Sequence, residues 1–273
     1  MRLAVMSRVP EHSTAKPPIV LIHGAWHGAW CWENNFLDYF AREGWQVHAL
    51  SLRGHGESEG RGRLRWWSIA DYVEDVAQVV SSLERPPILI GHSMGGFIAQ
   101  KYLERHPAAG AVLLASVPPS GTLGFNLRAS RRHPLIWLAA NLMMSPYLLV
   151  KNPDHARHWF FSPGISREAL AAHHAKLQQE SYRAALDMLA LNLPRPRLIK
   201  APIAVVGAED DQIIAASEIE QTARAYGVEP RIFASAHNMM SEPQWKSVAA
   251  WIADWAASVA GSGDRAQAEV RGS

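Results

Sequence analysis

The sequence predicts an α/β fold in which helices flank a mostly parallel sheet. Short apolar runs, of the kind that a strand covered on both faces requires, alternate with helix-compatible segments along most of the chain. Between residues 120 and 200 the alternation stops, and helical segments rich in Leu, Met, Trp and Phe follow one another between prolines. We therefore expect a core of residues 1–119 and 201–260, interrupted by a helical cap at residues 120–200.

The elements before the cap follow from apolar runs and capping signals. Residues 3–9 are compatible with an edge strand. Gly44 suits the C-terminus of one helix, and Ser68 with Asp71 resembles a capping box at the start of another. We expect strands at residues 19–22, 45–50, 86–90 and 109–115, and helices at 30–43, 68–83 and 97–106.

The elements after the cap repeat the same pattern. Strands are expected at residues 203–206 and 231–233, and helices at 217–226 and 244–259. Residues 261–273 are small and polar, which predicts a disordered tail.

The composition excludes several classes of protein. A formal charge of +2, without any block rich in arginine or lysine, does not indicate a nucleic-acid partner. The single cysteine, Cys31, excludes an internal disulfide and suits a reducing compartment. No apolar stretch is long enough for a membrane span, and the apolar run at the N-terminus is too short for a signal peptide. We therefore expect a cytoplasmic protein.

Residues 91–95 form a Gly-x-Ser-x-Gly motif between the predicted strand at 86–90 and a helix. Strand, sharp turn and helix in this order are the context of a nucleophile elbow, which holds its serine in a strained conformation with the hydroxyl exposed above the sheet edge. An ordinary turn with a capping serine is the alternative. The flanking apolar run and Gly96, which permits close packing of helix on sheet, favour Ser93 as a nucleophile.

A glycine turn also follows the predicted strand at residues 19–22. Gly24 lets the backbone turn sharply after His23, which can aim the N–H of Ala25 into the space above the sheet. Together with the N–H of Met94, this amide would form an oxyanion hole. His23-Gly24 is equally compatible with a plain turn from strand to loop.

A serine nucleophile needs a base to take its proton and an acid to orient that base. Acidic residues follow the predicted strand at 203–206, and we prefer Asp211 because the apolar residues after it would anchor it against the core. Asp210 is the second choice and Glu209 the third. His237 follows the last predicted strand and precedes the final helix, which makes it the candidate base.

Neither a metal nor an organic cofactor is expected. His155, His158, His173 and His174 lie in the helical insertion, but they lack a His-Glu-x-x-His motif and cysteine partners. The glycines lack the Gly-x-Gly-x-x-Gly spacing of dinucleotide-binding proteins.

Taken together, four segments resemble the alpha/beta-hydrolase fold superfamily with a helical cap. They are His23-Gly24, Arg53-Gly54-His55-Gly56-Glu57-Ser58, the pentapeptide around Ser93, and Asp211 with His237, in the family's order. Residues 23–32 are similar to the hydroxynitrile lyase and plant methylesterase branch. The resemblance implies the alpha/beta-hydrolase fold and Ser-His-Asp machinery, while the adjacent aspartates leave the acid unsettled.

The predicted activity is hydrolysis of carboxylic esters of small to medium hydrophobic substrates, with thioesters and lactones as variants. The partner is then a small-molecule ester, and the sequence leaves the oligomeric state open. An apolar pocket is expected from large side chains near the elbow and in the cap. The candidate substrate-binding residues are Trp26, Trp137, Met143, Trp159, Phe160 and Met239.

Other activities use the same catalytic parts. The chain also resembles carbon–carbon bond hydrolases of the meta-cleavage type, and the fold includes hydroxynitrile lyases and cofactor-free oxygenases. A non-catalytic binding module on the same scaffold is the alternative from another class, and the presence of a serine, a histidine and an acid disfavours it.

Overall fold

The computed structural model describes residues 1–10 and 16–271. They form a seven-stranded sheet in the order β1-β3-β2-β4-β5-β6-β7. β1 pairs antiparallel with β3, and every other pair of neighbours is parallel. The strands are β1 (Val5–Arg8), β2 (Ile19–Ile22), β3 (Val47–Leu50), β4 (Ile88–His92), β5 (Gly110–Leu114), β6 (Ile203–Ala208) and β7 (Pro230–Phe233). The predicted fold class is confirmed.

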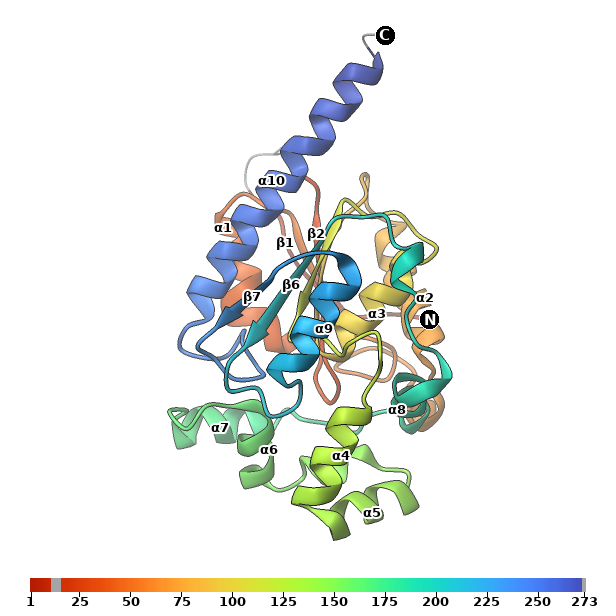
Figure 1. Ribbon diagram of the computed structural model, residues 1–273, viewed down its shortest axis with the longest axis vertical. Helices are drawn as coiled ribbons and strands as arrows, with labels where there is room; N and C mark the ends of the chain where they lie inside the picture. The colour runs from red at the N-terminus through yellow and green to blue at the C-terminus, as the bar shows by residue number, and fades with distance from the viewer. Residues whose placement is uncertain (11–15, 272–273) are drawn as a thin grey trace.

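Helices cover both faces of this sheet. In Figure 1, α1 and α10 lie on one side of the strands and α2, α3 and α9 on the other. The core helices are α1 (Asp38–Arg42), α2 (Ile69–Val80), α3 (Met94–Leu103), α9 (Ala216–Tyr226) and α10 (Trp245–Arg271). Short 3₁₀ or π turns occupy Ala29–Trp32, Glu33–Leu37, Arg61–Trp66, Pro146–Leu149, Asp187–Leu191 and Pro196–Leu198.

The alternation of side chains along the strands divides the core into two layers. Val20 and Ile22 of β2 pack with the side of α2 and α3, whereas Ile19 and Leu21 pack with the side of α1 and α10. All four side chains are fully buried. Burial on both faces explains why the strands appear in the sequence as continuous apolar runs.

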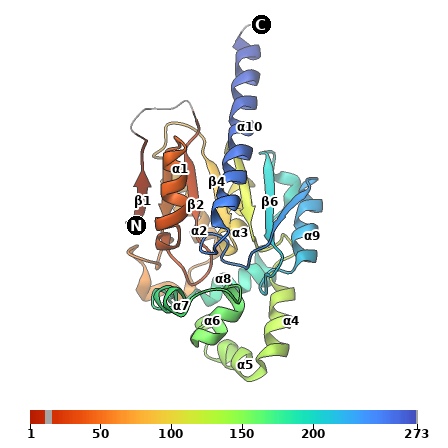
Figure 2. The same ribbon diagram turned by 90° about the vertical axis from the view of Figure 1, so that its left-hand side faces the viewer.

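Five α-helices lie between β5 and β6 and form a helical layer. Its helices lie together beyond one end of the sheet in both views (Figures 1 and 2). In Figure 1, β6 ends on the side of this layer, and β2, β4 and β5 run parallel to it, so the carboxyl ends of all four strands face the layer. The helices are α4 (Leu123–Arg132), α5 (Pro134–Leu142), α6 (Pro153–Phe160), α7 (Arg167–His174) and α8 (Tyr182–Leu186).

Two predicted segments differ from the structure. The helix expected at residues 30–43 is divided into a 3₁₀ turn, a π turn and α1, and it ends before Gly44, which has a φ of 80°. The tail expected to be disordered from residue 261 continues α10 as far as Arg271. Residues 272 and 273 of that predicted tail lie outside the described residues. Residues 265–269, Arg-Ala-Gln-Ala-Glu, favour a helix, whereas residues 261–264, Gly-Ser-Gly-Asp, disfavour one, so local propensity alone does not account for the extension.

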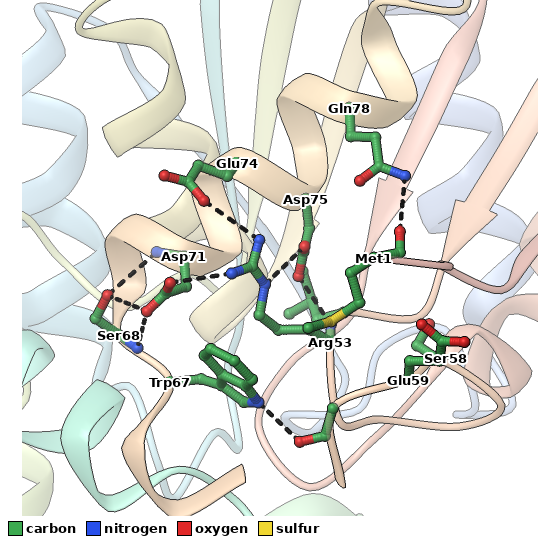
Figure 3. A network of polar contacts seen from close by, with 12 residues as sticks. Met1, Arg53, Ser58, Glu59, Trp67, Ser68, Asp71, Glu74, Asp75 and Gln78 are labelled. Atoms are coloured by element: carbon green, nitrogen blue, oxygen red, sulfur yellow. Dashed lines mark hydrogen bonds and ion pairs between the residues drawn. The ribbon is translucent and has the colours of Figure 1, made fainter. Parts of the chain in front are cut away.

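The Arg-Gly-His-Gly segment is held against α2 by a network of ion pairs (Figure 3). Nε of Arg53 lies 2.8 Å from Asp75 Oδ1, and its Nη1 lies 3.0 Å from Asp71 Oδ1. The ring of Trp67 stacks on the guanidinium at 5.2 Å. Asp71 also completes the capping box with Ser68, as the sequence predicts. Arg53 therefore anchors the loop that begins at residue 53 to helix α2.

Candidate active site

Ser93 occupies a strained turn between β4 and α3. Its φ of 53° and ψ of −117° lie in a region that residues with a Cβ rarely adopt. Gly95 permits this turn, because a Cβ there would come within 2.6 Å of the His23 carbonyl oxygen. The N–H of Ser93 donates to the carbonyl of Leu114 at the end of β5, which fixes the turn to the sheet. The backbone conformation expected of a nucleophile elbow is present.

Asp211 and His237 meet at the carboxyl ends of β6 and β7. Asp211 Oδ2 lies 2.8 Å from His237 Nδ1, and its Oδ1 accepts hydrogen bonds from the backbone N–H groups of Ile213 and Ile214, both at 2.8 Å. Both side chains are buried. Asp210, by contrast, is exposed and has no bond to the imidazole. The apolar residues after Asp211 therefore anchor it through their amides.

His237 lies beside the elbow. The ring of His92, the residue before Ser93, packs against the ring of His237 with 4.7 Å between centroids, and His92 Nε2 lies 2.9 Å from the His237 carbonyl oxygen. The ring of Phe160 stacks on the ring of His237, with 6.3 Å between their centroids. These contacts hold the imidazole of His237 next to the turn that carries Ser93.

Two backbone amides remain available near the elbow. Within the described residues, neither the N–H of Ala25 nor that of Met94 has a hydrogen-bond partner. Met94 is the first residue of α3, and N–H groups in the first turn of a helix have no acceptor within it. Both residues line the same cavity as Ser93. They are therefore suited to bind an oxyanion.

A sequence model described as the alpha/beta hydrolase family matches residues 19–251. The chain belongs to this family. Among curated relatives, a monoacylglycerol lipase from Mycolicibacterium smegmatis is 27% identical over 256 residues, covering 87% of this chain and 86% of the relative. A pyrethroid hydrolase from Sphingobium wenxiniae is 34% identical over 101 residues, which is 36% of this chain and 35% of that protein.

Solved structures that are similar to this alpha/beta hydrolase have the same fold. An esterase from Thermogutta terrifontis superposes with a TM-score of 0.74 at 19% identity, covering 94% of this chain and 93% of that one. The enol-lactonase from Burkholderia xenovorans gives a TM-score of 0.68 at 18% identity, covering 94% and 95%. At these identities the likeness concerns the fold.

The cavity beside Ser93 lies between the hydrolase core and the cap. It encloses about 100 Å³, and its wall is mostly apolar. Two pairs of polar side chains in the wall bond to each other: Trp137 Nε1 donates to Asn126, and the hydroxyl of Tyr182 donates to Asn141. Apolar lining residues include Trp26, Val117, Phe125, Trp137, Leu149, Met188, Ile213 and Ile214.

Four of the six predicted substrate-binding residues lie outside this cavity wall, which includes Trp26 and Trp137. Met143 is exposed on the cap, and Met239 is fully buried in the core layer of α1 and α10. Trp159 is buried among the cap helices against Phe125. Phe160 packs between Trp26 and His237, so it supports two site residues from behind. We therefore restrict the candidate binding residues to those of the wall.

Glu180 is a site residue that the sequence analysis misses. This buried carboxylate lines the cavity and lies 3.1 Å from the N–H of Trp26, 3.0 Å from Nε2 of His55 and 3.1 Å from the hydroxyl of Tyr72. It also accepts from the N–H of Ser181. Burial by itself raises the pKa of the carboxyl, but attraction to His55 and these hydrogen bonds outweigh it and hold the pKa of Glu180 below its ordinary value.

The position of Glu180 explains the shape of the turn after β2. Trp26 has a φ of 66°, which is unfavourable for a residue with a side chain. The hydrogen bond from its N–H to Glu180 stabilises this conformation, and the preceding peptide carries the free N–H of Ala25. Glu180 is therefore a positioning residue for the candidate oxyanion hole, and it links this hole to the cap.

Replacing Glu180 with glutamine is expected to destabilise the fold and to reduce kcat more than it changes KM. The amide has one acceptor oxygen for four donors, and loss of one partner of a buried ionic network costs about 3–5 kcal/mol. Denaturant unfolding and ester kinetics test this expectation. Glu168→Gln, an exposed glutamate on α7, is the matched control. Wild-type stability and kcat in Glu180→Gln would contradict the positioning role.

Four histidines near the site are buried in neutral form. Burial lowers the pKa of His23, His92 and His173 well below the ordinary value, and it lowers that of His27 to about 4. His27 Nδ1 lies 2.6 Å from the Ala25 carbonyl oxygen, and its Nε2 lies 2.9 Å from His173 Nε2 on α7. Among the described residues, no three His, Cys, Asp or Glu side chains could hold a metal ion together.

These pKa shifts predict that stability falls below neutral pH. Between pH 6.5 and about 4 the unfolded chain binds a proton at His27 that the folded chain does not, so stability rises with pH across this window. His27 alone contributes about 3 kcal/mol, fully present above pH 6.5 and lost as the pH falls to about 4. Urea unfolding at pH 7 and pH 5 should show about 2 kcal/mol of this contribution, because pH 5 lies inside the window. His27→Gln should shrink the difference, whereas replacing the exposed His106 should not.

In the part of the chain that the structure describes, none of the helices combines the length and apolar character needed to cross a bilayer.

Proposed function

We propose that this alpha/beta hydrolase cleaves carboxylic esters of hydrophobic acids or alcohols through an acyl-enzyme on Ser93. The observation that carries the proposal is that Ser93, at the elbow, shares one apolar cavity with Ala25 and Met94, whose amides are free. The contact of Asp211 with His237 beside the elbow supports it. The esterases and lipases among the relatives support the same reaction class.

In the first half of the reaction, Ser93 Oγ attacks the ester carbonyl while His237 Nε2 takes the hydroxyl proton. The N–H groups of Ala25 and Met94 bind the oxyanion of the tetrahedral intermediate. Asp211 keeps Nδ1–H of His237 in place, so Nε2 presents its lone pair to the hydroxyl. When the intermediate collapses, the bond to the alcohol oxygen breaks and His237 returns the proton to that oxygen.

In the second half, water replaces the alcohol. His237 takes a proton from the water, whose oxygen attacks the acyl carbonyl. The bond to Ser93 Oγ then breaks, the proton returns to the serine, and the carboxylic acid leaves. Thioesters and lactones fit the same steps because they differ only in the leaving group.

Labelling with a fluorophosphonate probe tests the activated serine. We expect stoichiometric labelling that peptide mapping places on Ser93, and faster hydrolysis of p-nitrophenyl butyrate than of short polar esters. The panel also contains a cyanohydrin and a ring-fission product, which represent lyase and carbon–carbon hydrolase activity. A folded protein that neither reacts with the probe nor turns over esters would refute the proposal.

A further inference from the structure

Cap helices α4 and α5 expose large apolar side chains to solvent. Leu135 and Leu142 on α5 are 79% and 75% exposed. Half of the large hydrophobic residues that are exposed in the described chain lie between residues 123 and 143. They are Leu123, Leu127, Leu135, Leu138, Leu142 and Met143. A gathering of this kind is unusual on a surface that faces only water.

The spacing of these residues places them in stripes. Leu135, Leu138 and Leu142 follow one another at three and four residues, which aligns them on one face of α5. Leu123 and Leu127 are likewise four residues apart on α4. Since α4 and α5 pack against each other, the stripes belong to one region of the cap.

The same two helices use other residues for the cavity. Phe125 and Asn126 of α4 line it, as do Trp137 and Ala140 of α5. The exposed leucines are not part of its wall. Each helix is therefore apolar on two sides, and packing of the cap onto the core explains only one of them.

The position of the helices leaves this surface accessible. α4 and α5 lie at the end of the molecule opposite to the end of α10 in both views (Figures 1 and 2). No other helix or strand of the described residues lies beyond them in either view.

The charge of the segment has a single sign. No aspartate or glutamate occurs from residue 105 to residue 153. Arg131, Arg132 and Lys151 are exposed, and Arg131 continues the stripe of Leu123 and Leu127 by one more helical turn. Apolar side chains bordered by cations, without acids, match a surface that offers both hydrocarbon and negative charge.

We propose that α4 and α5 dock onto an anionic lipid surface. The exposed leucines enter the boundary between headgroups and acyl chains, while the arginines and Lys151 bind lipid phosphates. One side of α4 and α5 would then contact the membrane, while the opposite side of the same helices lines the cavity. This proposal does not depend on the role of Ser93, because it concerns binding and not catalysis.

Sedimentation with vesicles tests it, using Ser93→Ala protein so that the lipids stay intact. We expect binding to vesicles of phosphatidylglycerol and phosphatidylcholine, weaker binding to phosphatidylcholine alone, and a decrease with salt. Leu135→Gln with Leu142→Gln should lower the partition coefficient about tenfold or more. Arg131→Gln with Arg132→Gln should lower it by about the same factor on anionic vesicles only. Leu198→Gln, an exposed leucine outside these helices, should have no effect.

The same substitutions in protein that keeps Ser93 control for folding. These variants should hydrolyse a soluble ester as the wild type does, since none of the replaced residues lines the cavity. Absence of vesicle binding by the folded protein would overturn the proposal, as would unchanged binding of the leucine pair. Gel filtration adds a third outcome. If the leucine pair converts a dimer to a monomer without affecting vesicle binding, a second copy of the chain covers this surface and the lipid proposal fails.

Discussion

Replacing Ser93 with alanine is expected to lower kcat for p-nitrophenyl butyrate by about 10⁴-fold or more while the fold is retained. The physical reason is that no other group in the proposed mechanism can form the acyl-enzyme. Without the hydroxyl, His237 and Asp211 have no nucleophile to activate. Residual hydrolysis by bound water, assisted by the amides of Ala25 and Met94, sets the remaining rate.

Steady-state kinetics with active-site titration measures this loss, and circular dichroism and thermal unfolding check the fold. Ser116→Ala is the matched control, because Ser116 is a buried serine just after the neighbouring strand β5 and its hydroxyl bonds to Gln100 and Val117. The control should keep its activity within a few-fold. More than about 1% of wild-type turnover in Ser93→Ala would exclude Ser93 as the nucleophile.

The strands and the elbow could be predicted because local residues determine them. The runs at residues 19–22, 88–90 and 203–206 are apolar throughout, and in the structure both faces of these strands are covered. The turn at Ser93 needs glycines on both sides, since a Cβ at Gly91 or Gly95 would collide with backbone. Requirements of this kind are visible in the sequence itself.

Glu180 could not be predicted, because its environment is assembled from distant parts of the chain. The segment Gln178-Gln179-Glu180-Ser181 has the composition of an exposed loop. Its carboxylate is nevertheless buried by donors from residues 26, 55 and 72, which are more than 100 positions away. A charged residue is rarely buried without such partners, and the sequence does not show which partners meet it.

The sequence does not show which apolar side chains line the pocket, for a related reason. An apolar side chain in a helical layer can face the cavity, the core or solvent, and composition does not distinguish these cases. Met143 faces solvent, Met239 the core and Trp137 the cavity. The orientation of each depends on how α4, α5 and the loop after β7 pack.

Substitutions of the adjacent residues Asp210 and Asp211 are expected to have very different effects on kcat. We propose that Asp211 is the acid, and we expect Asp211→Asn to lower kcat by about 10³–10⁴-fold and Asp210→Asn to leave it nearly unchanged. An asparagine at 211 can keep its carbonyl oxygen on the amides of Ile213 and Ile214, so the loop should stay folded. Its amide nitrogen would then face Nδ1 of His237, which must accept a hydrogen bond instead of donating one.

In that tautomer the proton sits on Nε2 of His237, where the lone pair for the serine proton is needed, and the base no longer works at neutral pH. The pair of variants separates this chemistry from general effects of charge, because each removes one negative charge from the same loop. Asp210 lies at the exposed hollow formed with Asp154 and Arg157 and has no bond to the imidazole. A large loss in Asp210→Asn with an active Asp211→Asn would transfer the role to Asp210, and the contact with His237 would then be structural only.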